Sequence, residues 1–130
     1  NKIFTNEYDF KDYDRATNIY WPGNKLGHGR EDVIKLWNSL INILSETKFK
    51  IEHVGYLDEP NRNPRASVRW SLEGIHSKDS KDYGKKTNSR LTIIGINHAE
   101  LNPYGVIKEW VLFDEVAIWK QILMNKNKDV

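Results

Sequence analysis

Apolar and polar residues alternate with the two-residue period of a β-strand in three long runs of this chain. The runs are RASVRWSLEGIH over 65–76, SRLTIIGINHAEL over 89–101 and VIKEWVLF over 106–113. The segment NPYG between the second and third runs places Asn, Pro and Gly as a type I turn does, so it predicts a hairpin. Helical spacing then follows over 116–124.

A helix and a further strand are predicted before these runs. Apolar residues recur at helical spacing between residues 30 and 47; they are Val33, Trp37, Leu40, Ile41 and Leu44. Residues 49–57 alternate as a strand, and DEPNRNP then provides a turn. We interpret residues 1–28 as an irregular but packed loop, because WPGNKLGHG is rich in Gly and Pro.

The order of helix, four strands and helix predicts an α+β fold with helices covering one face of a mostly antiparallel sheet. Parallel pairing is disfavoured, because no crossover helices separate the later strands. Strands longer than about ten residues twist and curl, which leaves a concave face able to hold a ligand. We therefore expect a strongly curved sheet.

Composition sets the bounds of this interpretation. With 130 residues we expect residues 1–130 to form a single domain. Five Trp, six Tyr and four Phe argue against disorder, and the absence of Cys excludes disulfide and thiolate chemistry. The formal charge is +2 with Lys and Arg interleaved among acidic residues, so we expect no nucleic-acid partner.

Targeting signals are not evident in the chain. No apolar run reaches the roughly 18 residues that span a bilayer, and the N-terminus lacks the apolar core of a secretory signal, so we expect no membrane partner and a cytoplasmic location. The sequence begins at Asn1 without Met. We interpret it as a processed form or as a fragment of a longer or tandem protein.

Strand periodicity sorts the side chains of each run onto two faces. The apolar face of the first run should point to the core; it carries Val68, Trp70, Leu72, Gly74 and His76. In the second run both faces are partly apolar, so its register stays open. In the third run Trp110, Leu112 and Asp114 share a face. The hypothesis that follows is one cavity lined by Trp70, His76, His98, Trp110 and Asp114.

The segments VRWSLEGIH, YGKKT, IIGINHAEL and EWVLFDEVAIWKQI together resemble the SnoaL-like polyketide cyclase group of the nuclear transport factor 2-like superfamily. The positions that carry the resemblance are Gly74 and His76, Trp110 and Asp114, and Gln121 and Ile122. The resemblance extends over roughly residues 20–123. It implies a cone: a curved, mostly antiparallel sheet wrapped around helices, with an internal cavity, and commonly a homodimer.

The chain departs from the family pattern mainly in its loops. Lys78 stands where the family often has Gly, Lys86-Thr87-Asn88 replaces Pro-Thr-Gly, and NPYGVI replaces the usual hairpin. The segment FKDYDRA is also a poor amphipathic helix where the family has its first helix. These changes leave the fold prediction intact and leave the substrate open.

The resemblance implies acid/base chemistry at carbon next to a carbonyl, with Asp114 as the base and His98 or His76 as its hydrogen-bonding partner. Such a carboxylate needs partial desolvation, so that its pKa rises toward the working pH, and a nearby donor for the enolate oxygen. No cofactor and no metal are implied. Further side chains are predicted to contact the ligand: Trp70, Trp110, Glu100, Leu112 and Trp37.

Structural roles compete with each of these assignments. Asp114 stands where an N-cap is expected, His76 fits a structural hydrogen bond, and Trp70 and Trp110 fit a core. His76, His98, Glu100 and Asp114 could hold a metal ion only if all four converged, and none has ligand spacing, so we expect no metal site.

Two functions follow from these alternatives. The first is a small-molecule-binding domain acting as a cofactor-independent cyclase or isomerase on an apolar or carbonyl-bearing molecule. The second is a non-catalytic ligand-binding or dimerisation module. An Asp114 carboxylate directed into free volume favours the enzyme, whereas an Asp114 bound to helix amides favours the module.

Overall fold

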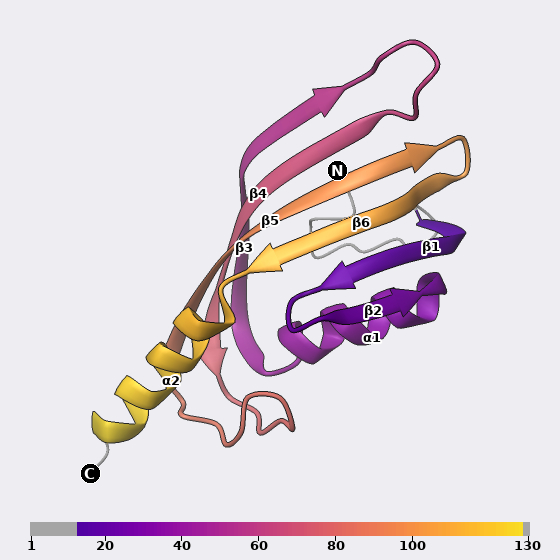
Figure 1. Cartoon of the computed structure of the whole chain (residues 1–130). Coiled ribbons are helices and arrows are strands. Elements are labelled where there is room, and N and C mark those ends of the chain that lie inside the picture. The colour runs from indigo at the N-terminus through magenta and orange to yellow at the C-terminus, as the bar shows by residue number, and fades with distance from the viewer. Residues whose placement is uncertain (1–12, 129–130) are drawn as a thin grey trace.

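The computed structural model describes residues 13–128. Within that range the sheet has the order β2-β1-β6-β5-β4-β3, strongly curved, with two helices beside it (Figure 1). This confirms the predicted α+β class. The elements in chain order are β1 (Tyr13–Trp21), β2 (Lys25–His28), α1 (Gly29–Ile41), β3 (Leu44–Leu57), β4 (Arg65–His76), β5 (Arg90–Asn102), β6 (Gly105–Phe113) and α2 (Glu115–Lys128).

The strongly alternating runs form strands close to their predicted bounds. β4 has its predicted bounds. β5 begins and ends one residue later than predicted, and β6 begins one residue earlier. The hairpin predicted at NPYG is present, with Asn102 paired to Gly105. The first helix is shorter than predicted, because it ends at Ile41 and the buried Leu44 already belongs to β3. The helical spacing of apolar residues includes Leu44, so the sequence did not show that the helix ends at Ile41.

The interpretation of residues 1–28 as a loop was wrong for the part that the structure describes. Residues 13–28 form β1 and β2, joined by a turn in which Gly23 and Asn24 have positive φ angles of 85° and 59°. The sheet is mostly antiparallel, as predicted, and β1 pairs in parallel with β6. The intervening chain, with its helix and long strands, provides the crossover that neighbouring hairpins lack. The segment FKDYDRA begins outside the described residues and ends in β1.

The helices occupy different parts of the sheet. α1 packs on β1 and β2 through the buried side chains of Val33, Trp37 and Leu40 (Figure 1). α2 follows β6 and packs on β5, with Ile118 and Ile122 buried.

Gln121 of α2 binds the edge of β5. Its Oε1 accepts the backbone N–H of Thr92 at 2.8 Å, and its Nε2 donates to the carbonyl oxygen of Thr92 at 2.9 Å. The last pair between β5 and β6 is Gly95 with Phe113, so β6 has ended before Thr92 is reached. The side-chain amide therefore satisfies the backbone groups that β6 leaves unpaired.

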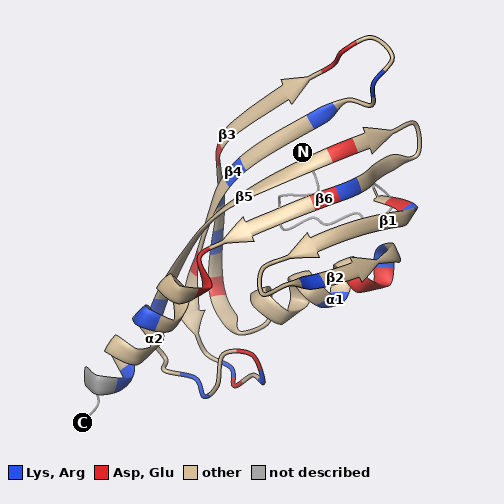
Figure 2. Cartoon of the chain, in the orientation of Figure 1, with Lys and Arg blue, Asp and Glu red and all other residues tan. Residues whose placement is uncertain are grey.

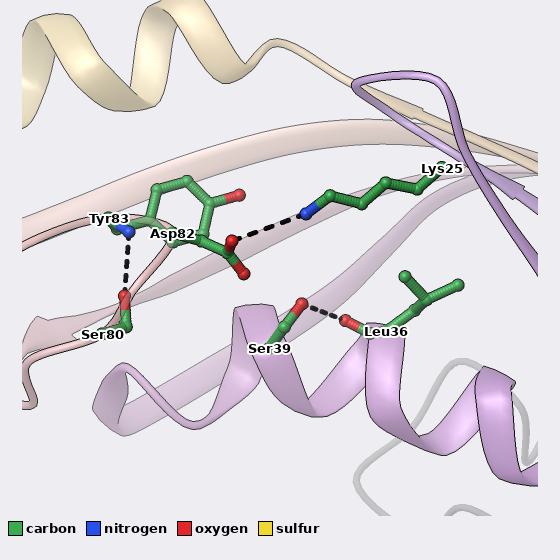
Figure 3. Close-up of polar contacts among 6 residues, drawn as sticks. All are labelled: Lys25, Leu36, Ser39, Ser80, Asp82 and Tyr83. Carbon is green, nitrogen blue, oxygen red and sulfur yellow. Dashed lines mark hydrogen bonds and ion pairs between the residues drawn. The ribbon is translucent and has the colours of Figure 1, made fainter.

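The connection between β4 and β5 is held by several contacts. Asp82 Oδ1 lies 3.6 Å from Lys25 Nζ at the start of β2, and the N–H of Tyr83 donates to Ser80 Oγ at 2.9 Å (Figure 3). Nearby on α1, Ser39 Oγ donates to the carbonyl oxygen of Leu36 at 2.6 Å (Figure 3). The Tyr83 ring is buried and lies 6.2 Å from that of Trp119. This polar segment therefore packs through its tyrosine.

Aromatic rings from four elements fill one region of the core. The rings of Trp21 and Trp37 are 4.9 Å apart, those of Trp21 and Phe113 are 5.3 Å apart, and those of Trp37 and Trp70 are 5.8 Å apart. Edge-on and tilted arrangements of this kind stabilise aromatic pairs beyond their buried area.

Candidate functional site in the sheet interior

The residues predicted to share one cavity lie on opposite faces of the sheet. Trp70, His76 and Trp37 are buried on the inner side, as expected. His98, Trp110 and Leu112 point outward, and Trp110 and Leu112 are 40% and 67% exposed. The inner face of β5 and β6 instead carries the alternate residues, among them Asn97 and Glu109.

The orientation predicted for the third run was therefore wrong. The register of the second run, which the sequence left open, places His98 on the outer side and not in the predicted cavity. Both faces of β5 are apolar, and the outward one carries Ile94 and Ile96. Gly95 decides the register, because the Trp70 indole of β4 lies directly over it and leaves no room for a side chain. Gly95 must face inward, and Asn97 and Ala99 follow it with the two-residue period.

Asp114 acts as the N-terminal cap of α2. Its Oδ1 accepts the N–H of Ala117 at 3.0 Å, and the residue is exposed on the outer side of the sheet. This is the structural role that competed with catalysis in the sequence, and it stabilises a helix start by satisfying an amide that has no partner within the helix.

The two histidines have different environments. His76 is buried, and its Nδ1 lies 3.2 Å from Thr87 Oγ1. Burial lowers the pKa of His76, and the charge of Asp79 partly opposes that shift. His98 is exposed and sets its ring edge-on against Trp110, with centroids 6.2 Å apart. Glu100, on the same outer side, is half-buried opposite Lys108. These positions do not converge, and no cluster in the part of the chain that is described could hold a metal ion.

A carboxylate does lie in the interior, at Glu109 of β6. Its side chain is fully buried, and the Tyr13 hydroxyl lies 3.0 Å from Oε1 and 2.8 Å from Oε2. Burial raises the pKa of Glu109 to about 7, while hydrogen bonds from Tyr13 and Trp37 act in the opposite direction. The requirement of a desolvated carboxyl with a pKa near neutrality, expected at Asp114, is thus met by Glu109.

Two more polar groups flank Glu109 on the neighbouring strands. Glu109 is opposite Ala99 of β5 and Ile19 of β1, and the buried residues Asn97 and Thr17 lie two positions away on those strands. Asn97 Oδ1 accepts the indole N–H of Trp70 at 2.8 Å. The Asn97 Nδ2 and the Thr17 Oγ1 are buried without a hydrogen-bond partner among the protein atoms. A polar strip therefore crosses three strands on the inner face.

The members of this strip were not among the predicted site residues. Glu109 and Asn97 lie in predicted strands but on the faces opposite to those that carry Asp114 and His98, and Tyr13 and Thr17 fell in the presumed loop. A signal was present in Gly95: a glycine in a long strand marks a close approach by another group, and it shares its face with Asn97.

Charges do not gather on one element of the fold. Figure 2 shows acidic and basic residues interspersed along the strands and the two helices. The ion pairs among the described residues are formed by exposed or half-exposed side chains, for example Arg90 with Glu73 at 3.6 Å. In the described range no helix is long and apolar enough to cross a bilayer.

Comparisons with known proteins give relatives by structure only. No family model and no curated protein matches the sequence. The chain is similar to a candidate SnoaL-like polyketide cyclase from Jannaschia sp. (14% identity, 83% of this chain and 74% of that one, TM-score 0.66). It is also similar to AclR, a candidate hydroxylase from Streptomyces galilaeus (10% identity, 88% of this chain and 80% of that one, TM-score 0.67). A third similar structure is that of IdmH, a candidate polyketide cyclase from Streptomyces antibioticus (13% identity, 85% of this chain and 81% of that one, TM-score 0.64).

Identities this low establish the fold and leave the reaction open, since one fold hosts many activities. The structural relatives themselves carry descriptions of two different activities, cyclase and hydroxylase. The resemblance found in the residues is confirmed at the level of the fold: this chain shares the fold of the solved SnoaL-like polyketide cyclases.

Proposed function

We propose that this chain binds a small carbonyl-bearing molecule in the interior of its sheet and moves a proton next to the carbonyl. The observation that carries the proposal is the buried Asn97 Nδ2, which has no hydrogen-bond partner among the protein atoms. Around the polar strip, the inner face is lined by aromatic and aliphatic side chains. A buried donor left unpaired costs about 1–3 kcal/mol, so a bound polar atom is its natural complement.

The surroundings suit a molecule that is mostly apolar. The Trp70 indole donates a hydrogen bond to the Asn97 amide oxygen, and its ring packs against that of Trp37. The Trp21 ring packs in turn against Trp37 and Phe113. Small-molecule sites typically combine such apolar walls with a few polar groups that orient the ligand. The structural relatives described as candidate polyketide cyclases agree with a ligand of this class.

Binding of 2-tetralone, an aromatic ketone, tests the proposal. We expect saturable quenching of tryptophan fluorescence by 2-tetralone in the wild-type protein, because three tryptophans lie together in the interior. Asn97→Ala should weaken binding about tenfold, the worth of one hydrogen bond of about 1.4 kcal/mol. Asn38→Ala, on the exposed side of α1, is the matched control. Absence of saturable binding to the wild-type protein would refute the proposed ligand class.

We also propose that the chain forms a homodimer through the outer face of the sheet. Ile94 and Leu112 are 64% and 67% exposed there, beside Ile96 and Val116, and they line a groove of about 640 Å³. Arg69 lies on this groove together with the acidic pair Asp114 and Glu115. A two-fold axis would bring these opposite charges together across an interface whose apolar residues meet their own copies.

Leu112→Glu is expected to dissociate this dimer. A charge placed at the centre of an apolar interface should raise the dimer dissociation constant at least thirtyfold, corresponding to about 2 kcal/mol. Sedimentation velocity over a concentration series measures the effect. Leu26→Glu on β2 is the control, because Leu26 is 64% exposed and lies away from the groove. A wild-type monomer at all concentrations, or a Leu112→Glu dimer, would contradict the proposal.

A second candidate function, a non-catalytic binding or dimerisation module, is favoured by one observation. The Asp114 carboxylate is hydrogen-bonded to the Ala117 amide and is therefore engaged in capping α2. This cap favours a structural role for Asp114, which is compatible with a catalytic one, and does not bear on Glu109. The cytoplasmic location stays a prediction.

A further inference from the structure

We propose that Glu109 is the group that transfers the proton in this interior, that Tyr13 positions its carboxylate, and that Asn97 donates to the carbonyl oxygen of the bound molecule. The inference rests on the proposed function and specifies its chemistry. It assigns proton transfer to the inner face of β6 in place of the strand end at Asp114, where the sequence resemblance placed it.

The Glu109 carboxylate is bound by neutral hydrogen-bond donors and is not paired with a positive charge among the described residues. Tyr13 of β1 donates its hydroxyl to the carboxylate, Trp37 of α1 contributes a hydrogen bond, and Ala99 is the residue opposite on β5. In the described part of the chain none of the ion pairs includes Glu109. A salt bridge would keep the group ionised at all working pH values, whereas these neutral donors leave it able to gain and lose a proton.

Tyr13 is itself fixed in place. The Nε–H of Arg30 on α1 donates to the backbone carbonyl oxygen of Tyr13 at 2.7 Å, which ties the start of β1 to the helix. The Tyr13 hydroxyl lies within 3.0 Å of both oxygens of Glu109, so it holds the plane of the carboxylate. Tyr13 is therefore a positioning residue, because it acts through Glu109.

The orientation of the Asn97 amide follows from its partner. An indole N–H can only donate, so the Trp70 Nε1 at 2.8 Å must face the Asn97 oxygen. The Asn97 Nδ2 is then the free donor. Asn97 and Glu109 are diagonal neighbours on antiparallel strands, a relation that separates the residues by about 7–8 Å. The carboxylate and the free amide donor therefore lie on the same inner face of the sheet, on neighbouring strands.

The step is a balanced proton transfer. The Glu109 carboxylate takes a proton from the carbon next to the carbonyl, and the C–H electron pair becomes a carbon–carbon double bond. The carbonyl π electrons move to oxygen, where the Asn97 N–H stabilises the enolate. The Glu109 carboxylic acid then returns a proton to the same carbon or to another carbon of the enolate. No oxidant, reductant or third reactant is required.

Exchange of the α-hydrogens of 2-tetralone in deuterium oxide, followed by proton NMR against a buffer blank, tests this assignment. We expect catalysed exchange by the wild-type protein and a loss of at least about a hundredfold in Glu109→Gln, the usual contribution of a general base. Glu109→Asp should retain more exchange than Glu109→Gln, because it keeps a carboxylate. Glu73→Gln makes the same change on the outer side of β4 and should leave the rate unchanged.

Four further readouts separate catalysis from a structural role. The wild-type rate should rise with pH and level off above about pH 7, because the base must be ionised and burial raises the Glu109 pKa to about 7. Tyr13→Phe should shift that pH profile, whereas Asn97→Leu should lower the rate at every pH. Asp114→Asn decides between the two carboxylates: exchange that survives in Asp114→Asn and fails in Glu109→Gln supports the inference.

The contrary results are distinct. Saturable binding of 2-tetralone to the wild-type protein without catalysed exchange overturns the role of Glu109 and leaves the proposed ligand class standing. Exchange that persists in a folded Glu109→Gln variant, as judged by circular dichroism, also overturns it. Absence of both binding and exchange overturns the inference together with the proposed function.

Discussion

Glu109→Gln is expected to be more stable than the wild-type protein at pH 8, by up to about 3 kcal/mol. The folded protein raises the pKa of this carboxyl from 4.5 to about 7 because the side chain is fully buried. A pKa change of that size corresponds to about 3 kcal/mol at about 1.4 kcal/mol for each tenfold change in the proton affinity. Glutamine keeps the size of the side chain and removes the buried charge.

The sign of the pH dependence follows from linkage. Below about pH 4.5 the carboxyl is protonated in both states and carries no penalty. Between about pH 4.5 and pH 7 the unfolded chain ionises while the folded protein keeps its proton, so the free energy of unfolding falls as the pH rises. Above about pH 7 both states are ionised and the penalty is constant.

Urea unfolding of wild-type and Glu109→Gln proteins at pH 5 and pH 8 measures this effect as a difference between the two. The comparison is needed because the lowered pKa of the buried His76 acts in the opposite direction, costing stability as the pH falls below its ordinary value of 6.5. Glu73→Gln serves as the exposed control. Equal pH dependence of the wild-type and Glu109→Gln proteins would contradict a raised pKa at Glu109.

Gly95→Ala is expected to destabilise the fold by about 3 kcal/mol or more, at the upper end of overpacking effects. A Cβ at this position would lie 2.2 Å from Trp70 Cζ2 and 2.5 Å from Trp70 Cε2. The indole cannot move aside easily, because it is fully buried, bonded to Asn97 and stacked on Phe49 at 5.6 Å. Urea or thermal unfolding measures the loss.

A double-mutant cycle identifies the cause of the Gly95→Ala effect. Trp70→Phe removes the indole carbons that meet the new Cβ, so Gly95→Ala should cost at least about 1 kcal/mol less in that background. Gly55→Ala on β3 is the control, because its Cβ would meet only the Ser67 Oγ, at 2.8 Å, and a hydroxyl can rotate away. Additive effects of the two substitutions would show that another contact is responsible.

The parts of the fold that the sequence predicts well are those with one apolar face. In β4 the apolar set that includes Val68 and Trp70 is opposed by the polar Arg69 and Glu73, and both its bounds and its buried face were predicted. Hydrophobic burial acts on such a strand in one direction only, so the pattern and the structure agree.

The register of β5 and β6 could not be obtained in the same way. Ile94 and Leu112 are as apolar as the residues that face the core, yet they lie on the outer face, where we propose that a second copy covers them. An interface and a core leave the same pattern in a strand. The face of β5 that points inward is fixed by a contact between two strands, because the Trp70 indole packs directly over Gly95. A single sequence does not show which residues are in contact.

The candidate site was predicted at Asp114 and not at Glu109 because the inward face of β6 was not recognised. Asp114 matched the family motif, and its cap position was recognised, but Glu109 lies on the face of the third run opposite to the one assigned to the cavity. Its partner Tyr13 lies 96 positions away, on a strand that pairs in parallel with β6. Contacts over such separations depend on topology, which local periodicity does not encode.

The two hydrogen bonds between Gln121 and Thr92 occupy backbone groups of β5 at which another strand could otherwise pair. An unpaired strand edge is a template on which another chain can add a strand. Here the primary amide of one side chain presents a carbonyl and an N–H to β5 much as a peptide group would, at 2.8 and 2.9 Å. The helix thus ends the sheet on that side, and a neighbouring molecule finds those backbone groups already occupied.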